Sequence, residues 1–107
     1  MGLTADVELN LKDAGLIEFF NKNRPVFKVI AGKAYAFAYD YVHATGLPLR
    51  HDDVAKSLTA ALVANESLRD FLATKKLRQN FWNVRFADLI LDRLWKELTD
   101  EYTSAHP

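Results

Sequence analysis

The sequence predicts an all-α fold, a compact bundle of four or five helices with short loops. Apolar residues recur at three- and four-residue spacing in several segments, which is the period of a helix with one buried face. Residues that start and stop helices stand at the ends of these segments. Half of the 107 residues are apolar, which is enough for one modest core. We therefore expect residues 1–107 to form a single helical domain.

The most clearly delimited helix is expected from about Pro25 to Thr45. Asn23 precedes it as a cap, and proline is tolerated in a first turn because its missing N–H would have no partner there. Gly46 supplies a left-handed end, and Pro48 cannot continue the helix. The spacing predicts a buried face made of Phe27, Ile30, Ala31, Ala34, Ala38, Tyr41 and Thr45.

The same segment has an alternative interpretation. Its aromatic residues alternate with smaller ones from Tyr35 to Tyr41, and period two with aromatics is typical of a strand. With a turn at 31–33, residues 26–42 would form a small hairpin, and the fold class would become α+β. We favour the helix because alanine is the best helix former and a poor strand former.

Three more helices are expected toward the C-terminus. One runs from Asp52 to Ala64, and a second begins at a cap formed by Asn65 or Ser67. The last runs from about Asn80 to Tyr102. The buried stripe predicted for this last helix is Val84, Ala87, Leu91, Leu94, Leu98 and Tyr102.

The N-terminal segment is harder to assign. Residues 13–22 predict a short helix with Asp13 as its cap. Residues 6–11 alternate apolar and polar side chains, which fits either a short strand or the start of a helix.

Composition and charge exclude several classes of protein. Fourteen basic residues balance fourteen acidic ones, and there is no cysteine, which excludes a disulfide scaffold and a cysteine-based zinc site. No apolar stretch approaches the length of a membrane span. The acidic N-terminus does not resemble a signal peptide. We expect a cytoplasmic protein with no membrane partner.

The first half of the last helix is apolar almost all round. Such a helix either lies at the centre of the fold or buries its second face in a partner. Aromatic and apolar residues with an arginine at the rim are typical of interface hot spots. The leading hypothesis is therefore a non-enzymatic module for protein–protein interaction or oligomerisation, an adaptor, accessory or regulatory subunit whose partner is another protein or itself, as a homodimer. The predicted partner-binding residues are Trp82, Arg85, Phe86, Leu89 and Ile90.

The alternative hypothesis is a nucleic-acid-binding domain that uses the basic segment 74–85. Residues 69–85 carry five basic residues against one acidic residue, a local charge of +4. As one continuous helix, the segment would place basic and amide side chains around an aromatic ring, an arrangement suited to phosphates and unstacked bases. The residues of this site are Lys75, Lys76, Arg78, Gln79, Trp82 and Arg85.

Catalytic patterns are absent from the sequence. There is no cysteine nucleophile, no G-x-S-x-G and no glycine-rich phosphate loop, so we expect no enzyme activity, no cofactor and no metal. The weakest of three hypotheses is a metal-dependent enzyme that uses Asp40, His43 and His51, because carboxylates and imidazoles are common metal ligands. His43 and the two aspartates at 52 and 53 are more simply partners of helix dipoles.

Overall fold

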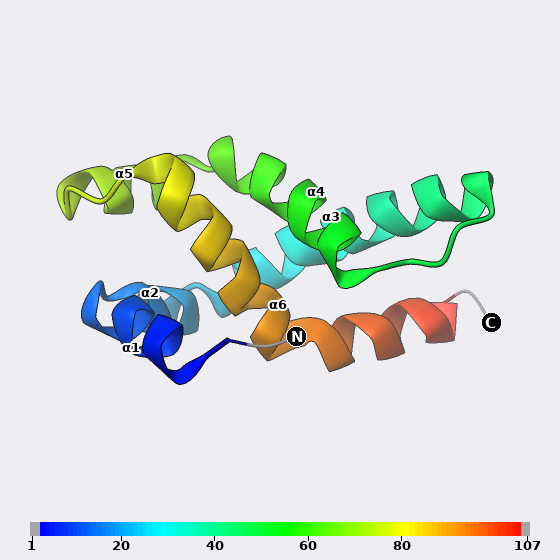
Figure 1. Ribbon diagram of the computed structural model, residues 1–107, viewed down its shortest axis with the longest axis horizontal. Helices are drawn as coiled ribbons and strands as arrows, with labels where there is room; N and C mark the ends of the chain where they lie inside the picture. Colours follow the sequence, from blue (N-terminus) through cyan, green and yellow to red (C-terminus); the bar gives the residue numbers. More distant parts are fainter. Residues whose placement is uncertain (1–2, 106–107) are drawn as a thin grey trace.

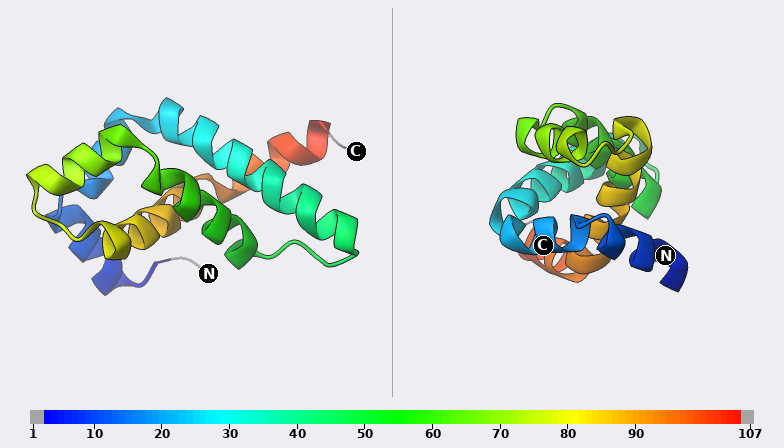
Figure 2. Two further views of the ribbon diagram at one scale, coloured as in Figure 1. Left: turned by 90° about the horizontal axis from the view of Figure 1, so that it is seen from above. Right: turned by 90° about the vertical axis from the view of Figure 1, so that its left-hand side faces the viewer.

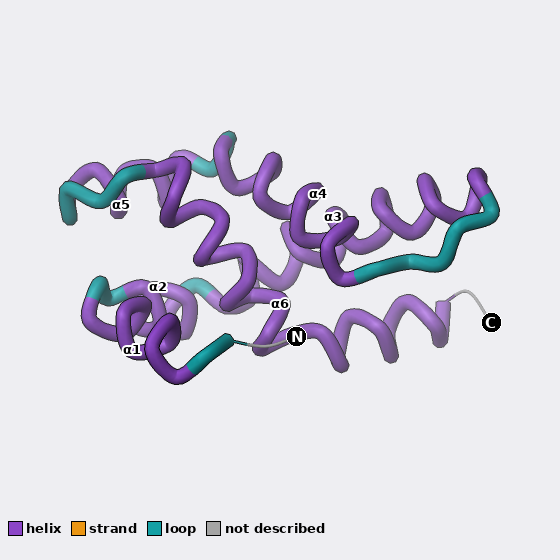
Figure 3. The backbone as a smooth tube through the Cα atoms, viewed as in Figure 1, coloured by secondary structure: helices purple, strands orange, loops and turns teal. Residues whose placement is uncertain are grey.

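The computed structural model describes residues 3–105, and helices occupy most of this range (Figure 1). No strand occurs in these residues, as the colouring of Figure 3 shows. The all-α class is therefore confirmed, and the α+β alternative with a hairpin at 26–42 is wrong. The described helices are α1 Ala5–Asp13, α2 Leu16–Lys22, α3 Arg24–Thr45, α4 His51–Val63, α5 Glu66–Thr74 and α6 Gln79–Ala105.

Residues 3–105 hold six helices rather than four or five because the N-terminal segment forms two. Thr4 caps α1, and its hydroxyl accepts a hydrogen bond from the Val7 N–H at 3.3 Å. Asp13 ends this helix and does not cap the next one. Gly15 separates the two helices with a φ of 80°, a left-handed conformation that favours glycine.

Helix α3 begins at Arg24, but the expected cap is wrong, because the Asn23 side chain makes no capping hydrogen bond and instead donates to the Phe19 carbonyl at 2.9 Å. The expected C-terminal end of α3 is confirmed. Gly46 is left-handed with a φ of 75°, and the Leu47 N–H donates to the Val42 carbonyl at 2.9 Å. The expected buried face is correct in its first half, but Tyr41 and Thr45 are exposed. Val42 is buried in their place because a period of 3.6 residues carries the stripe from Ala38 to Val42.

Helix α6 lies at the centre of the fold. It contacts all five other helices, and α3 and α4 pack along each other as an antiparallel pair joined by residues 46–50. Figure 1 and the two views in Figure 2 show α1 and α2 at one end of the molecule, beside the first half of α6. The chain measures about 42 × 26 × 22 Å along its principal axes. Among residues 3–105, no helix has the length and hydropathy that a membrane crossing requires.

Candidate interaction surfaces

The apolar patch expected on the last helix lies mostly in the core. Phe86, Leu89 and Ile90 are 0% exposed, so they cannot contact a partner in this conformation. The reason is the central position of α6, whose two apolar faces are covered by different helices of the same chain. Val84, expected inside, is instead 49% exposed.

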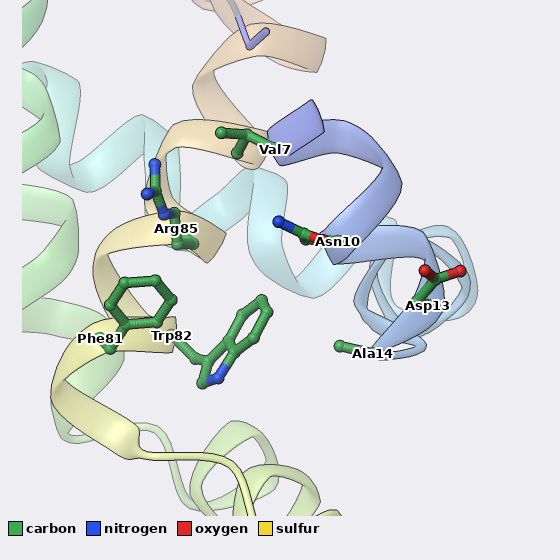
Figure 4. Close-up of a pocket in the computed structure, with 7 residues that line it drawn as sticks. All are labelled: Val7, Asn10, Asp13, Ala14, Phe81, Trp82 and Arg85. Carbon is green, nitrogen blue, oxygen red and sulfur yellow. The ribbon is translucent and has the colours of Figure 1, made fainter. Parts of the chain in front are cut away.

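Trp82 and Arg85, the other two residues of that patch, do reach the surface. They line a cleft of about 330 Å³ between α1 and the first turns of α6. Figure 4 shows Arg85 and Trp82 beside Phe81, with Val7 and Asn10 of α1 across the cleft. We call this the α1–α6 cleft, and its lining residues are Val7, Asn10, Asp13, Ala14, Phe81, Trp82 and Arg85.

The basic segment 74–85 is not one continuous helix. Helix α5 ends at Thr74, and Lys76 adopts a left-handed conformation with a φ of 58°. The Lys76 and Leu77 N–H groups donate to the Ala73 and Leu72 carbonyls at 3.0 and 2.9 Å, which is the hydrogen-bond pattern of a Schellman helix end. Because the chain turns here, Lys75 and Arg85 do not share a helical face.

The structure brings some of the predicted nucleic-acid-binding residues together around Phe81. The guanidinium carbons of Arg85 and Arg78 lie 5.1 and 5.9 Å from the centre of its ring. Trp82 meets the same ring edge to face, with centroids 5.3 Å apart. On the other side of Phe81 lies a second depression, the α6 start hollow, lined by Arg78, Gln79, Asn80 and Phe81.

Two of the predicted basic residues lie apart from this group. The Lys75 ammonium is 5.7 Å from the centre of the Phe71 ring and lines a different depression, beside α2. Lys76 is exposed in the loop. Phe81, which sequence reasoning did not select, is the centre of the arrangement. The sequence pattern that could have identified Phe81 is an aromatic residue between two arginines at the start of a helix.

The three residues of the metal hypothesis do not form a cluster. The Asp40 carboxylate accepts a hydrogen bond from the Tyr102 hydroxyl at 3.0 Å. His43 stacks on Tyr39, and His51 packs against Trp95. Across residues 3–105, no three side chains of the metal-ligating types come together in a way that could hold an ion.

Protein-family models, curated proteins and solved structures yield no match to this chain.

A surface that sequence reasoning missed runs along α3. Four of its large apolar side chains are more than half exposed. Tyr41 had been expected inside, and Phe37 had no assigned position. At about 100° per residue, the exposed side chains fall on one side of the helix. We call this side the outer face of α3, and its residues are Val26, Val29, Lys33, Phe37, Asp40 and Tyr41.

A groove runs beside this face. Phe37, Ala38 and Tyr41 of α3 line it together with Asp53, Lys56 and Ser57 of α4, and its volume is about 350 Å³. We call it the α3–α4 groove. Tyr35 lies on the other side of α3, where it is buried against Trp95 and Tyr102 of α6.

Several charged groups away from these surfaces are paired. Arg24 and Lys28 of α3 both contact Glu97 of α6, and Lys28 also contacts Glu101. The hydrogen bond from Arg24 lowers the pKa of Glu97, and the bonds to Glu101 and Glu97 raise the pKa of Lys28. These contacts fix the start of α3 against the end of α6.

Proposed function

We propose that this chain is a non-enzymatic helical interaction module that self-associates through the outer face of α3. The observation that carries the proposal is the exposure of two aromatic side chains on that face, 68% for Phe37 and 66% for Tyr41. A homodimer formed in this way fits the role of an adaptor, accessory or regulatory subunit. This surface takes the place of the patch expected on the last helix.

The apolar area exposed on the outer face of α3 favours association. Covering a large apolar side chain is worth about 1.5–3 kcal/mol relative to leaving it in water. Val26 and Val29 extend the aromatic pair toward the start of α3. From Val26 to Tyr41 the outer face of α3 is about 22 Å long, at ~1.5 Å per residue. Exposed apolar side chains that gather on one face among polar residues are typical of interaction sites.

The charges on the outer face favour a second copy of this chain as the occupant. Lys33 and Asp40 lie seven residues apart, and therefore on nearly the same side of α3. Along the axis they stand about 6 and 4.5 Å from Phe37, in opposite directions. When two α3 helices pair antiparallel about a twofold axis near Phe37, Lys33 of each copy lies level with Asp40 of the other.

Both charged groups are free to make this contact. Lys33 is exposed and makes no ion pair with any residue in the described range 3–105. Asp40 has one oxygen bonded to the Tyr102 hydroxyl, which leaves the other oxygen available. An isologous contact of this kind closes as a dimer because the same surface serves both partners.

The α3–α4 groove offers a concave surface into which side chains of the second copy can insert. Its apolar wall is formed by Phe37 and Tyr41, the side chains that the second copy would bring. A few residues in well-packed pockets, tyrosine often among them, contribute most of the binding energy of an interface. The groove therefore supports mutual insertion of aromatic rings across the twofold axis.

Sedimentation velocity over a range of protein concentrations tests the proposal. We expect a concentration-dependent dimer for the unmodified chain and a monomer for Phe37→Glu. The matched control is Phe81→Glu, which places the same charge on an exposed phenylalanine of another surface and should still dimerise. A monomer at every concentration, or equal dissociation in both variants, would show that the outer face of α3 does not mediate self-association.

A further inference from the structure

The junction of α5 and α6 carries several cations that make no ion pair with residues 3–105. Lys75, Lys76, Arg78 and Arg85 make no ion pair or hydrogen bond through their side chains with residues 3–105. By contrast, six other basic residues of the chain are paired with carboxylates. Positive charge is therefore concentrated at the junction of α5 and α6, where Arg85 has an acidic group, Asp88, close enough for its charge to act on it.

Phe81 stands between two depressions that have the same kinds of lining groups. The α1–α6 cleft contains Arg85 and the carboxamide of Asn10, and the α6 start hollow contains Arg78 and the carboxamides of Gln79 and Asn80. Side chains of these carboxamides make no hydrogen bond within the described residues. Each side of the Phe81 ring thus offers a cation, a free donor and acceptor, and an aromatic wall.

We propose that this pair of depressions binds single-stranded nucleic acid, with Phe81 between two consecutive bases. Unpaired bases stack on aromatic and guanidinium planes, and carboxamides bond to their edges. Arg78 and Arg85 contact the phosphates. Phe81 is 44% exposed, and bases reach its ring when the guanidinium groups of Arg78 and Arg85, which lie over it in the free chain, turn outward to the phosphates. A duplex conceals its base faces and cannot take this position.

Two polar residues near the site do not contribute to binding nucleic acid. Asp13 lines the far wall of the α1–α6 cleft and repels phosphate, so Asp13→Asn should tighten binding. Asn83, an amide in the same segment, is only 3% exposed and takes no part. The site shares no residue with the outer face of α3, so this proposal and the proposed self-association can fail independently.

Fluorescence anisotropy with a labelled oligothymidylate of about ten nucleotides tests the proposal. We expect saturable binding at low salt, weaker binding to a duplex of equal length, and loss of affinity with added salt. Phe81→Ala should weaken binding at least about fivefold, as expected for one lost stacking contact. Phe81→Leu, which keeps apolar volume without a π face, should weaken binding similarly, and the circular dichroism of both variants should match the unmodified chain.

Charge variants distinguish binding at this site from nonspecific electrostatic attraction between the chain and the nucleic acid. Arg78→Glu with Arg85→Glu should abolish binding, whereas a smaller change, Arg78→Gln with Arg85→Gln, should reduce the slope of log affinity against log salt by about 1.4 for two phosphates. Lys12→Glu with Lys96→Glu has the same net charge as the first pair at other exposed positions and should bind within about twofold of the unmodified chain. The absence of saturable binding at low salt, an equal loss in this control, or equal affinity for polyglutamate would overturn the proposal.

Trp82 provides a direct reporter of the site. The chain has two tryptophans, and in Trp95→Phe the remaining one lines the α1–α6 cleft. Oligothymidylate should quench this emission with the affinity seen by anisotropy. Anisotropy binding with no change in Trp82 emission would place the strand elsewhere and contradict the assignment.

Discussion

Phe27 of α3 and Phe86 of α6 meet edge to face, with ring centroids 4.9 Å apart and ring planes at 86°. Phe19 and Phe20 of α2 also approach Phe86, at 6.0 and 6.4 Å between centroids. Aromatic pairs in such geometries contribute about 0.5–1.5 kcal/mol beyond the burial of their area. Phe86 therefore joins three helices at the centre of the core.

Replacing Phe86 by alanine should destabilise the whole fold. The side chain is 0% exposed, so its removal leaves a cavity that costs about 3–5 kcal/mol of the free energy of unfolding. Urea unfolding followed by circular dichroism measures the change. Phe81→Ala is the control, since its half-exposed side chain should cost less than about 1 kcal/mol. Equal urea midpoints for the two variants would contradict the central packing of Phe86.

Substitutions at two equivalent helix ends should have opposite effects. Lys76 and Gly46 occupy the same left-handed position after α5 and α3, with φ values of 58° and 75°. Lys76→Gly should raise the free energy of unfolding by about 1 kcal/mol, because a β-carbon is strained there. Gly46→Ala should lower the free energy of unfolding by a similar amount. The cause is backbone strain and not a clash, because a β-carbon at position 46 would meet no atom within 4 Å.

Thermal unfolding measures both changes, because each kcal/mol shifts the midpoint temperature by roughly 4–8 °C. Lys76→Ala is the control, because it keeps the strained β-carbon and should leave the midpoint nearly unchanged. A midpoint lowered by Lys76→Gly would mean that the lysine side chain stabilises the junction more than its backbone conformation costs.

Charge reversal at two positions of α3 should give dimers only when the variants are mixed. In the proposed dimer, Lys33→Glu alone places two carboxylates together, because the new acidic side chain faces Asp40 of the other copy. Asp40→Lys alone places two ammonium groups together. Each variant should therefore sediment as a monomer at concentrations where the unmodified chain dimerises. An equimolar mixture restores opposite-charge contacts and should form a heterodimer.

The double variant Lys33→Glu with Asp40→Lys provides the matched control. It exchanges the two charges within one chain and should dimerise by itself, although it loses the hydrogen bond between Asp40 and Tyr102. If the mixture stays monomeric while the unmodified chain dimerises, the antiparallel register centred on Phe37 is wrong.

Asp88 should make the stability of the fold depend on pH. Burial raises the pKa of its carboxyl group, and the positive charges of His51 and Arg85 partly oppose this rise. The folded chain therefore holds the Asp88 proton more tightly than the unfolded chain. Stability from this group is fully present below the ordinary aspartate pKa of about 4 and is lost as pH rises through the higher folded value.

Replacing Asp88 by asparagine should consequently raise the unfolding temperature at pH 7. Because the group is partly exposed, we expect a gain below about 1 kcal/mol. The gain should disappear when both proteins are measured below about pH 4. A gain of the same size at both pH values would show that burial of the charge is not its cause.

Local sequence signals located several helix ends well. Gly46 ends α3 because a left-handed residue closes the helix, and Asn65 caps α5 because its side-chain oxygen accepts the Leu68 N–H at 2.8 Å. Both depend on a few neighbouring residues. The same kind of signal failed at Lys76, where a lysine takes a position that usually holds glycine.

The candidate surfaces were only partly predictable. Trp82 and Arg85 were selected as surface residues and do line a cleft. Phe86 was selected with them but is buried, and Phe37 was not selected although it is the most exposed of the large apolar residues described. Both lie on helices that are apolar on more than one side, so spacing alone does not identify the face that meets solvent.

The all-α class and the extent of the main helices could be predicted from the amino-acid sequence, because capping, propensity and the 3.6-residue period act over short distances. Which apolar faces became core depended on contacts between helices that are distant in the sequence. Helix α6 is surrounded by five others, so Phe86 is buried. Helix α3 is covered on one side only, so Tyr35 packs inside while Phe37 is left in water. Periodicity tells which residues share a face, but only the packing of distant segments determines what covers it.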